Sequence, residues 1–433
     1  MSTVTPPMGW NSWDCYGTTV TEAEVLANAE FMAAHLLAHG WDTVVVDIDW
    51  SDPAARSHGY NTDAPLELDE WGRLIPDPVR FPSSAGGAGF GPLAVRIHAL
   101  GLRFGIHTMR GIPRRAVAQN LPILGTDAQA ADVADVTNVC EWNPDMVGID
   151  HTHPAAQAYY DSTLALYAGW GVDFIKSDDM LWPYQAADIE AYAEAIRRSG
   201  RDIVLSLSPG RDLSLERLDH LRAHADMWRI CDDLWDSWDD VAANFARFAR
   251  WAPFAGEHGW PDGDMLPLGR IGIRAERGEP RDDRLTPHER ISLMTLWIIA
   301  RSPLMIGGDL PSTDPATIAL FQNAEALAVI RQSSRNREVF REGRLVLWAA
   351  DGPAGERYAA AFNLGDEPFE AVLDAVNIGF PASGTVTELW SGHAVVLEPV
   401  SVQSDAARGV APGSAALRLT LQPHGAALLR HRD

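Results

Sequence analysis

Lysine is almost absent from this chain: of its 35 basic side chains, 34 are Arg and only Lys176 is Lys. An ammonium group is a compact point donor, whereas a guanidinium is a broad planar fork, so a small polar pocket can accept the first and reject the second. Lys176 lies in the segment GVDFIKSDDM (171–180), where a short apolar run meets two carboxylates. This position is the first candidate for a functional site, and the alternative is chance survival of one Lys.

The chain also lacks the features of several protein classes. Its three Cys are widely spaced and fit neither a disulfide framework nor a paired zinc motif, so we expect buried free thiols at Cys15, Cys140 and Cys231. The net charge of −24 argues against binding to nucleic acid or to an anionic membrane, because either requires a basic face. No run reaches the roughly 18 to 20 apolar residues of a membrane span, and the first residues do not resemble a secretory signal. We therefore expect a cytoplasmic protein.

The first 300 residues alternate short apolar runs with segments of helical period, which is typical of βα units around a parallel sheet. Eight strands are expected, at 43–47, 103–107, 173–176, 202–207, 227–230 and 303–306, with weaker ones near Gly9 and near Phe254. Helices are expected at about 22–38, 91–100, 154–169, 187–199, 211–223, 237–250, 287–300 and 313–326, with capping residues such as Thr21, Ser214 and Asp314. Eight such units suit an α/β fold of the closed (β/α)8 type, a TIM barrel, better than an open sheet.

A second domain follows the barrel. The pattern changes to a polar linker around 331–337 and then to short alternating runs with Gly, Pro and Asp turns. This pattern predicts a catalytic barrel over 1–332 and a C-terminal antiparallel β-sandwich over 338–433. The stretch 112–152 is a long excursion between strand three and helix three, where barrel enzymes keep functional loops.

Polar side chains gather at the carboxyl ends of five predicted strands, the barrel face on which active sites are built. They are Asp47 and Asp49; His107 and Arg110; Lys176, Asp178 and Asp179; Ser206 and Ser208; and Arg229, Asp232 and Asp233. A single Asp at such a place can simply cap the next helix, but Lys, Arg and His do not cap helix amino termini. Five polar strand ends in succession therefore predict a site.

The residue types at these strand ends limit the chemistry. Two carboxylates that face one bond are what glycoside hydrolysis requires, and Trp supplies flat faces for a sugar ring. Fourteen of the 16 Trp lie before residue 340. No cofactor or metal is expected, since there is no Cys/His ligand cluster and no Gly-rich phosphate loop. The alternatives are a Mg-dependent barrel enzyme, with a cation between Asp47, Asp178 and Asp233, and a non-catalytic carbohydrate-binding barrel.

Five ordered motifs carry a resemblance to a known family. They are PPMGWNSW (6–13), GVDFIKSD (171–178), Trp228-Arg229 followed by Asp233 and Ser237-Trp238, GWPDGDML (259–266), and Leu296-Trp297 with SPLMIGGDL (302–310). In this order they resemble the melibiase-type retaining α-galactosidases and α-N-acetylgalactosaminidases, glycoside hydrolase family twenty-seven. The resemblance spans the barrel and implies a C-terminal β-sandwich, no cofactor, and double displacement on a small-molecule glycoside or oligosaccharide. A homo-oligomer is possible.

The resemblance also implies the roles of individual residues. The family's nucleophile corresponds to Asp178 and its acid/base to Asp233, with Asp179 and Asp232 as the rivals beside them. The implied substrate-binding residues are Trp13 as one wall of the sugar pocket, Asp47 for the 4- and 6-hydroxyls, Lys176 for the 3- and 4-hydroxyls, Arg229 for the 2-hydroxyl, and Asp264 within its motif.

The chain departs from the galactosidase pattern at four places that bear on the substrate. Ile48, followed by Asp49, stands where a second Asp is expected beside Asp47, and His107 stands where a Tyr is expected. Ser208 replaces a larger acidic residue, as in the N-acetylgalactosaminidases. The 112–152 excursion has no counterpart and either lines the leaving-group subsites or covers the barrel rim. The expected activity is that of an α-galactosidase; the alternatives are an α-N-acetylgalactosaminidase, a β-L-arabinopyranosidase and an isomaltose-type glucan hydrolase.

Overall fold

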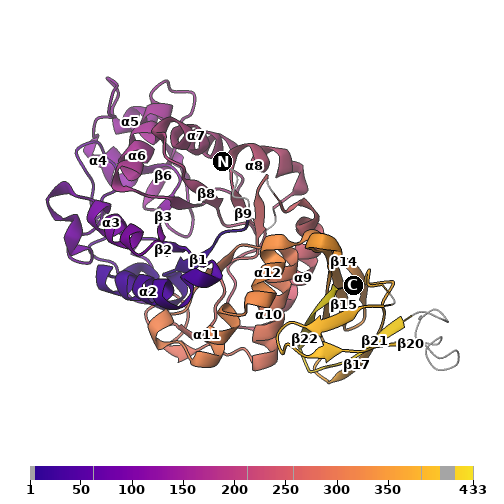
Figure 1. Cartoon of the computed structure of the whole chain (residues 1–433). Coiled ribbons are helices and arrows are strands. Elements are labelled where there is room, and N and C mark those ends of the chain that lie inside the picture. Colours follow the sequence, from indigo (N-terminus) through magenta and orange to yellow (C-terminus); the bar gives the residue numbers. More distant parts are fainter. Residues whose placement is uncertain are drawn as a thin grey trace.

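Eight parallel strands form one curled sheet at the centre of the N-terminal domain (Figure 1). The computed structural model describes residues 5–61, 63–211, 213–256, 258–381, 383–399 and 415–432. In sheet order the strands are β10 (Trp260–Asp262), β9 (Met227–Arg229), β8 (Val204–Leu207), β7 (Phe174–Asp178), β3 (Arg103–Met109), β2 (Thr43–Val46), β1 (Met8–Asn11) and β13 (Leu304–Ile306). A parallel bridge from Leu266 to Ile306 continues this order from the β10 side back to β13. The predicted (β/α)8 barrel is confirmed.

The strand predictions hold except at one place. The weak strand expected near Phe254 is wrong, because Ala252–Phe254 is a 3₁₀ turn at the end of a helix and β10 begins at Trp260. Pro253 lies in this turn, and a Pro has no N–H to donate to a strand ladder.

Helices separate the strands, as predicted. They are α1 (Trp13–Tyr16), α2 (Glu22–His35), α3 (Gly91–Ala99), α6 (Ala156–Trp170), α7 (Ala186–Ser199), α8 (Leu218–His224), α9 (Trp238–Trp251), α10 (Pro287–Ala300), α11 (Pro315–Phe321) and α12 (Ala324–Gln332). The side chains of Thr21, Ser214 and Asp314 cap helix starts as expected. The single helix expected at 313–326 is two helices, because the Asn323 side chain accepts a hydrogen bond from the Ala326 amide and starts α12. Among the described residues, no helix is long and apolar enough to cross a membrane.

The excursion after β3 has a structure of its own. It contains α4 (Arg114–Gln119), α5 (Ala130–Val133) and a three-stranded antiparallel sheet of β4 (Ile112–Pro113), β6 (Met146–Ile149) and β5 (Ala134–Val139). Residues 140–145, between β5 and β6, carry side chains to the carboxyl end of the barrel. A smaller pair of strands, β11 (Arg270–Ile271) and β12 (Arg281–Asp282), follows β10.

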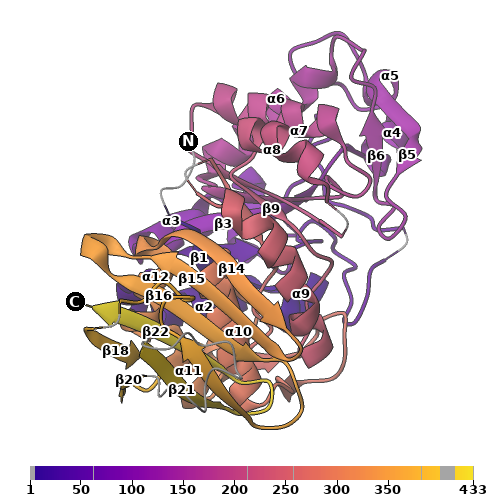
Figure 2. The same cartoon turned by 90° about the vertical axis from the view of Figure 1, so that its right-hand side faces the viewer.

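The C-terminal domain is built from two antiparallel sheets, as predicted. One holds β14 (Ser334–Glu342), β15 (Leu345–Asp351), β16 (Arg357–Asn363), β22 (Ala426–Arg432), β18 (Thr385–Glu388) and β19 (Ala394–Val395); the other holds β17 (Phe369–Asp374), β21 (Ala415–Leu421) and β20 (Leu397–Pro399). The expected linker is short, because β14 begins two residues after α12 ends. The first sheet lies beside α10 and α12 (Figure 2), and Trp390 Nε1 donates to Thr295 Oγ1 of α10 at 2.8 Å.

Candidate active site

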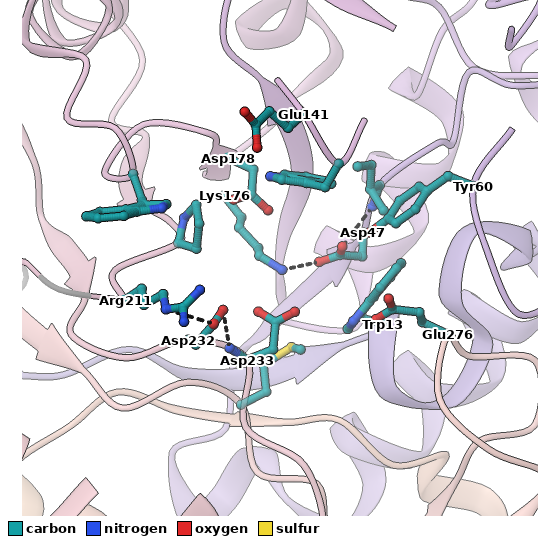
Figure 3. Close-up of a pocket in the computed structure, with 15 residues that line it drawn as sticks. Trp13, Asp47, Tyr60, Glu141, Lys176, Asp178, Arg211, Asp232, Asp233 and Glu276 are labelled. Carbon is teal, nitrogen blue, oxygen red and sulfur yellow. Dashed lines mark hydrogen bonds and ion pairs between the residues drawn. The ribbon is translucent and has the colours of Figure 1, made fainter. Parts of the chain in front are cut away.

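A cavity of about 350 Å³ opens among the loops that follow the barrel strands. It is lined by Trp13, Asp47, Ile48, Tyr60, Glu141, Trp142, Lys176, Asp178, Trp182, Pro209, Arg211, Asp232, Asp233, Met265 and Glu276. The two predicted catalytic residues, Asp178 and Asp233, therefore share one cavity with Trp13, Asp47 and Lys176 (Figure 3).

The single Lys of the chain is ion-paired at the floor of this cavity. Lys176 Nζ lies 2.9 Å from Asp47 Oδ2, which also accepts a hydrogen bond from Asn11 Nδ2 at 2.7 Å. Burial alone would lower the pKa of Lys176, but the negative charges of Asp47, Asp178 and Asp264 hold that pKa above its ordinary value. The ammonium group is therefore a permanent cation and a donor among carboxylates.

Asp178 ends strand β7 beside this ammonium group. His107 Nε2 donates to Asp178 Oδ2 at 3.1 Å, since an ionised carboxylate can only accept. Burial raises the pKa of Asp178, but the His107 hydrogen bond and the charges of Lys176 and Arg229 outweigh this effect and hold the pKa well below its ordinary value. Asp178 is therefore ionised and suited to act as a nucleophile.

The neighbouring carboxylate, Asp179, is turned away from the cavity. Its Oδ2 lies 2.8 Å from Arg110 Nη2, and both side chains are buried. Asp179 does not line the cavity, whereas Asp178 does. The geometry thus favours Asp178 over its rival.

Asp233 lies on the loop after β9, where its side chain is 41% exposed. Buried Arg229 bridges two carboxylates: its Nη2 lies 2.9 Å from Asp233 Oδ1 and its Nη1 lies 2.7 Å from Asp264 Oδ1. Asp264 does not line the cavity, so it positions Arg229 from behind. The rival Asp232 also lines the cavity, but it is more exposed and pairs with Arg211 at 3.9 Å.

Five predicted substrate-binding residues lie outside the main cavity: Arg229 and Asp264, described above, and Asp49, His107 and Ser208. Asp49 and His107 line a small separate cavity under residues 143–146. Burial there, together with the negative charges of Asp145 and Asp52, raises the pKa of Asp49 to about 8. Ser208 lines another small cavity of about 20 Å³ together with Lys176 and Arg229. His107 reaches the site only through its bond to Asp178, and Asp49 does not reach it.

Other cavity residues were not predicted as site residues. Tyr60, Trp142, Trp182, Arg211 and Glu276 all lie on loops after barrel strands, where no periodic pattern marks them. The one available signal was position, because each loop follows a strand end on the catalytic face. For Glu276, burial raises the pKa, Arg277 lowers it, and Asp233 raises it further.

Three side chains elsewhere lie close enough together to hold a metal ion. They are Glu190, His220 and His224, on α7 and α8, and their ligand atoms lie within 4.8 Å of one another. Within the described ranges, this is the one group of three or more His, Cys, Asp or Glu side chains that is so close. Asp47, Asp178 and Asp233 form no such group, and Lys176 already neutralises Asp47. The carboxylates of the cavity are therefore arranged singly and not as a ligand cluster of this kind.

Two carboxylates, the two cations Lys176 and Arg229, and aromatic walls on the catalytic face of a (β/α)8 barrel are the features of an O-glycosyl hydrolase. Residues 147–332 match the family model described as Alpha galactosidase A, and residues 342–431 match that of the Alpha galactosidase C-terminal beta sandwich domain. The chain belongs to glycoside hydrolase family twenty-seven.

Solved structures and sequence relatives agree with this assignment. The chain is similar to a β-L-arabinopyranosidase of Geobacillus stearothermophilus, with 45% identity, a TM-score of 0.94, and 100% of this chain and 97% of that chain covered. It is also similar to a putative α-N-acetylgalactosaminidase of Bacillus halodurans, with 43% identity, a TM-score of 0.86 and coverage of 100% and 98%. An α-galactosidase of Coffea arabica is 28% identical over 90% of this chain and 87% of the relative.

Proposed function

We propose that this enzyme is a retaining exo-glycosidase that removes a terminal, galactose-configured pyranose from a small-molecule glycoside or oligosaccharide. The observation that carries the proposal is the largely buried Asp178, which accepts a hydrogen bond from His107 and lies beside Lys176 in the same cavity as a second carboxylate, Asp233. Two carboxyl groups with different environments are what double displacement requires.

Asp178 and Asp233 carry out the hydrolysis in two steps. An Asp178 oxygen attacks the anomeric carbon while the bond to the leaving oxygen breaks and Asp233 gives that oxygen its proton. Water then attacks the same carbon, Asp233 takes the water proton, and the ester bond to Asp178 breaks to release the sugar. Lys176 and Arg229 stabilise the charge of Asp178 between turnovers.

The walls of the cavity favour one sugar over another. Ile48 lines the cavity beside Asp47, at a position where the galactosidase pattern has a second acid. Ile is larger than Asp and accepts no hydrogen bond, so it favours β-L-arabinopyranose, which has the galactose ring configuration without the hydroxymethyl group. The similarity to the Geobacillus stearothermophilus β-L-arabinopyranosidase supports the same choice. The α-galactoside is the second candidate, supported by Asp47 and by the α-galactosidase relatives.

An N-acetylated sugar fits less well. The cavity beside Ser208, Lys176 and Arg229 has about 20 Å³, which is room for about one water molecule. An acetamido group has four non-hydrogen atoms and does not fit there, so the small Ser208 does not by itself open a 2-substituent pocket.

A panel of p-nitrophenyl glycosides tests the proposal. We expect turnover of the β-L-arabinopyranoside above that of the α-galactoside, with little or none of the α-N-acetylgalactosaminide or the α-glucoside, and loss of all turnover in Asp178→Asn. If the wild-type enzyme hydrolyses no glycoside of the panel, the proposed function is wrong; if the N-acetylgalactosaminide is the best substrate, the cavity argument is wrong.

A further inference from the structure

We infer that Glu190, His220 and His224 form a binding site for a divalent transition metal ion such as Zn²⁺, which joins helices α7 and α8. The site is separate from the sugar cavity, since none of these three side chains lines that cavity. The inference goes beyond the proposed function and does not depend on it.

Two of the ligands come from one face of one helix. His220 and His224 are four residues apart on α8, and side chains at this spacing lie one above the other on a helix. Their ring centroids are 4.6 Å apart. Two His at this spacing on a helix can bind one Zn²⁺ from the same side. The helix α8 therefore supplies two imidazole ligands that are already next to each other.

The third ligand comes from the neighbouring helix, so it joins the His pair only in the folded protein. Glu190 stands on α7, which lies beside α8 in both views (Figure 1, Figure 2). Its Oε1 lies 3.1 Å from His220 Nε2, and the ligand atoms of all three side chains lie within 4.8 Å of one another. A tetrahedral Zn²⁺ with bonds of about 2.0 to 2.2 Å holds its ligand atoms roughly 3.4 Å apart, so small side-chain movements suffice. Glu190 is 56% exposed, and water can therefore complete the coordination.

Tyr184 holds the first imidazole through its other nitrogen. The Tyr184 hydroxyl lies 2.6 Å from His220 Nδ1, which leaves His220 Nε2 directed at Glu190. A hydroxyl can donate to a ring nitrogen or accept from it, so Tyr184 can also stabilise the tautomer in which Nε2 carries the free electron pair. Imidazoles that bind a metal ion are commonly oriented by a hydrogen bond of this kind.

The ligand types select the class of ion. Imidazole nitrogens together with a carboxylate suit Zn²⁺, Co²⁺, Ni²⁺ and Cu²⁺, whereas Mg²⁺ and Ca²⁺ prefer sites made of oxygen atoms alone. The positive charge of Arg197 acts on His224, but Glu194 pairs with that Arg. The site therefore carries the donors of a transition-metal site, with the nearby Arg already paired.

Calorimetric titration of Zn²⁺ into the metal-free protein, without an affinity tag, tests the site. We expect the wild type to bind Zn²⁺ and its melting temperature to rise with the Zn²⁺ concentration, because an ion that binds only the folded state stabilises it. Tyr184→Phe should weaken the binding by about tenfold, and His220→Ala, His224→Ala and Glu190→Gln by more than that. Mg²⁺ at the same concentrations should neither bind nor raise the melting temperature.

His39→Ala is the matched control. His35 and His39 have the same spacing as the pair on α8, but they lie at the end of α2 and in the 3₁₀ turn after it, and among the described residues no third ligand completes a group with them. This variant should bind Zn²⁺ as the wild type does, and melts without Zn²⁺ check that each variant is folded. If the wild type binds no Zn²⁺, or if the three ligand variants bind it unchanged, the inference is wrong and His220 only links Tyr184 to Glu190 by hydrogen bonds. Glycoside hydrolysis without Zn²⁺ should be unchanged in the ligand variants, so the outcome is independent of the proposed function.

Discussion

The floor and the mouth of the cavity are built in different ways. Asp47, Lys176, Asp178 and Arg229 at or beneath the floor stand on or next to barrel strands and are at most 14% exposed. Lys176 pairs with Asp47, Asp178 with His107, and Arg229 with Asp264. Arg211 and Asp232 at the mouth stand on loops and are more than half exposed. Removing one member of a buried pair is costly, whereas an exposed pair contributes little. The floor is therefore held in place by the sheet, whereas the side chains of the mouth depend on the loops.

The largest effect should come from the floor. Asp178→Asn removes the nucleophile, and we expect kcat/KM to fall by about 10⁴-fold or more. The Lys176–Asp47 pair remains in this variant, so the melting temperature should stay near that of the wild type. Steady-state kinetics on the best glycoside of the panel measure the effect. A variant that retains full activity would contradict the assignment.

Asp233→Asn should have the next largest effect, and this effect should depend on the leaving group. Loss of a general acid costs about 10²- to 10⁴-fold, but fluoride leaves without a proton. We therefore expect a large loss on a disaccharide and a much smaller one in the first step with the glycosyl fluoride. Asp232→Asn is the matched control, with a small effect on both substrates; equal losses for the two Asn variants would remove the distinction between them.

Lys176→Arg tests why one Lys remains in an Arg-rich chain. A guanidinium cannot occupy the space of an ammonium group 2.9 Å from Asp47 without displacing its neighbours, and a 1 Å displacement of reacting groups can cost about 10²-fold. We expect kcat/KM to fall by about that factor. Arg198→Lys, on the exposed face of α7, should have no effect. Full activity of Lys176→Arg would mean that the single Lys is an accident of composition.

Ile48→Thr tests the sugar preference of the floor. The change removes apolar bulk and adds a hydroxyl where the hydroxymethyl group of galactose needs a partner. We expect the ratio of kcat/KM for the α-galactoside to that for the β-L-arabinopyranoside to rise by about tenfold, the size of one such pocket contact. An unchanged ratio would show that Ile48 does not select the sugar.

His107→Phe should have the smallest effect at neutral pH and a clear one in acid. The His107 hydrogen bond lowers the pKa of Asp178, so its loss should raise that pKa toward its ordinary value or above. The nucleophile must be ionised, and a raised pKa means that protonation begins at higher pH. The acidic limb of the kcat/KM profile should therefore move to higher pH. An unmoved limb would show that His107 only fills space.

The parts of the site that could be predicted from sequence are those on or beside regular strands. Apolar runs placed β2, β3 and β7 to within a few residues, and so placed Asp47, His107 and Asp178 at one face of the barrel. The prediction of a strand near Phe254 was wrong, because this apolar run contains a Pro, follows the end of α9 directly and forms no hydrogen-bonded strand ladder.

Tertiary contacts decide the remainder. Asp49 and Asp179 stand close to Asp47 and Asp178, which line the cavity, yet both have positive φ, and backbone torsion at these two positions directs their side chains elsewhere. Trp142 and Trp182 face the cavity because two loops meet there, and no local pattern encodes that meeting.

The stereochemistry of the first-formed product tests the central claim most directly. The glycoside that the wild-type enzyme hydrolyses best is followed by ¹H NMR from the first minutes, before the free sugar mutarotates. If Asp178 and Asp233 act by double displacement, as we propose, the released sugar first carries the same anomeric configuration as the substrate. Initial release of the opposite anomer would show a single displacement by water and contradict the nucleophilic role of Asp178.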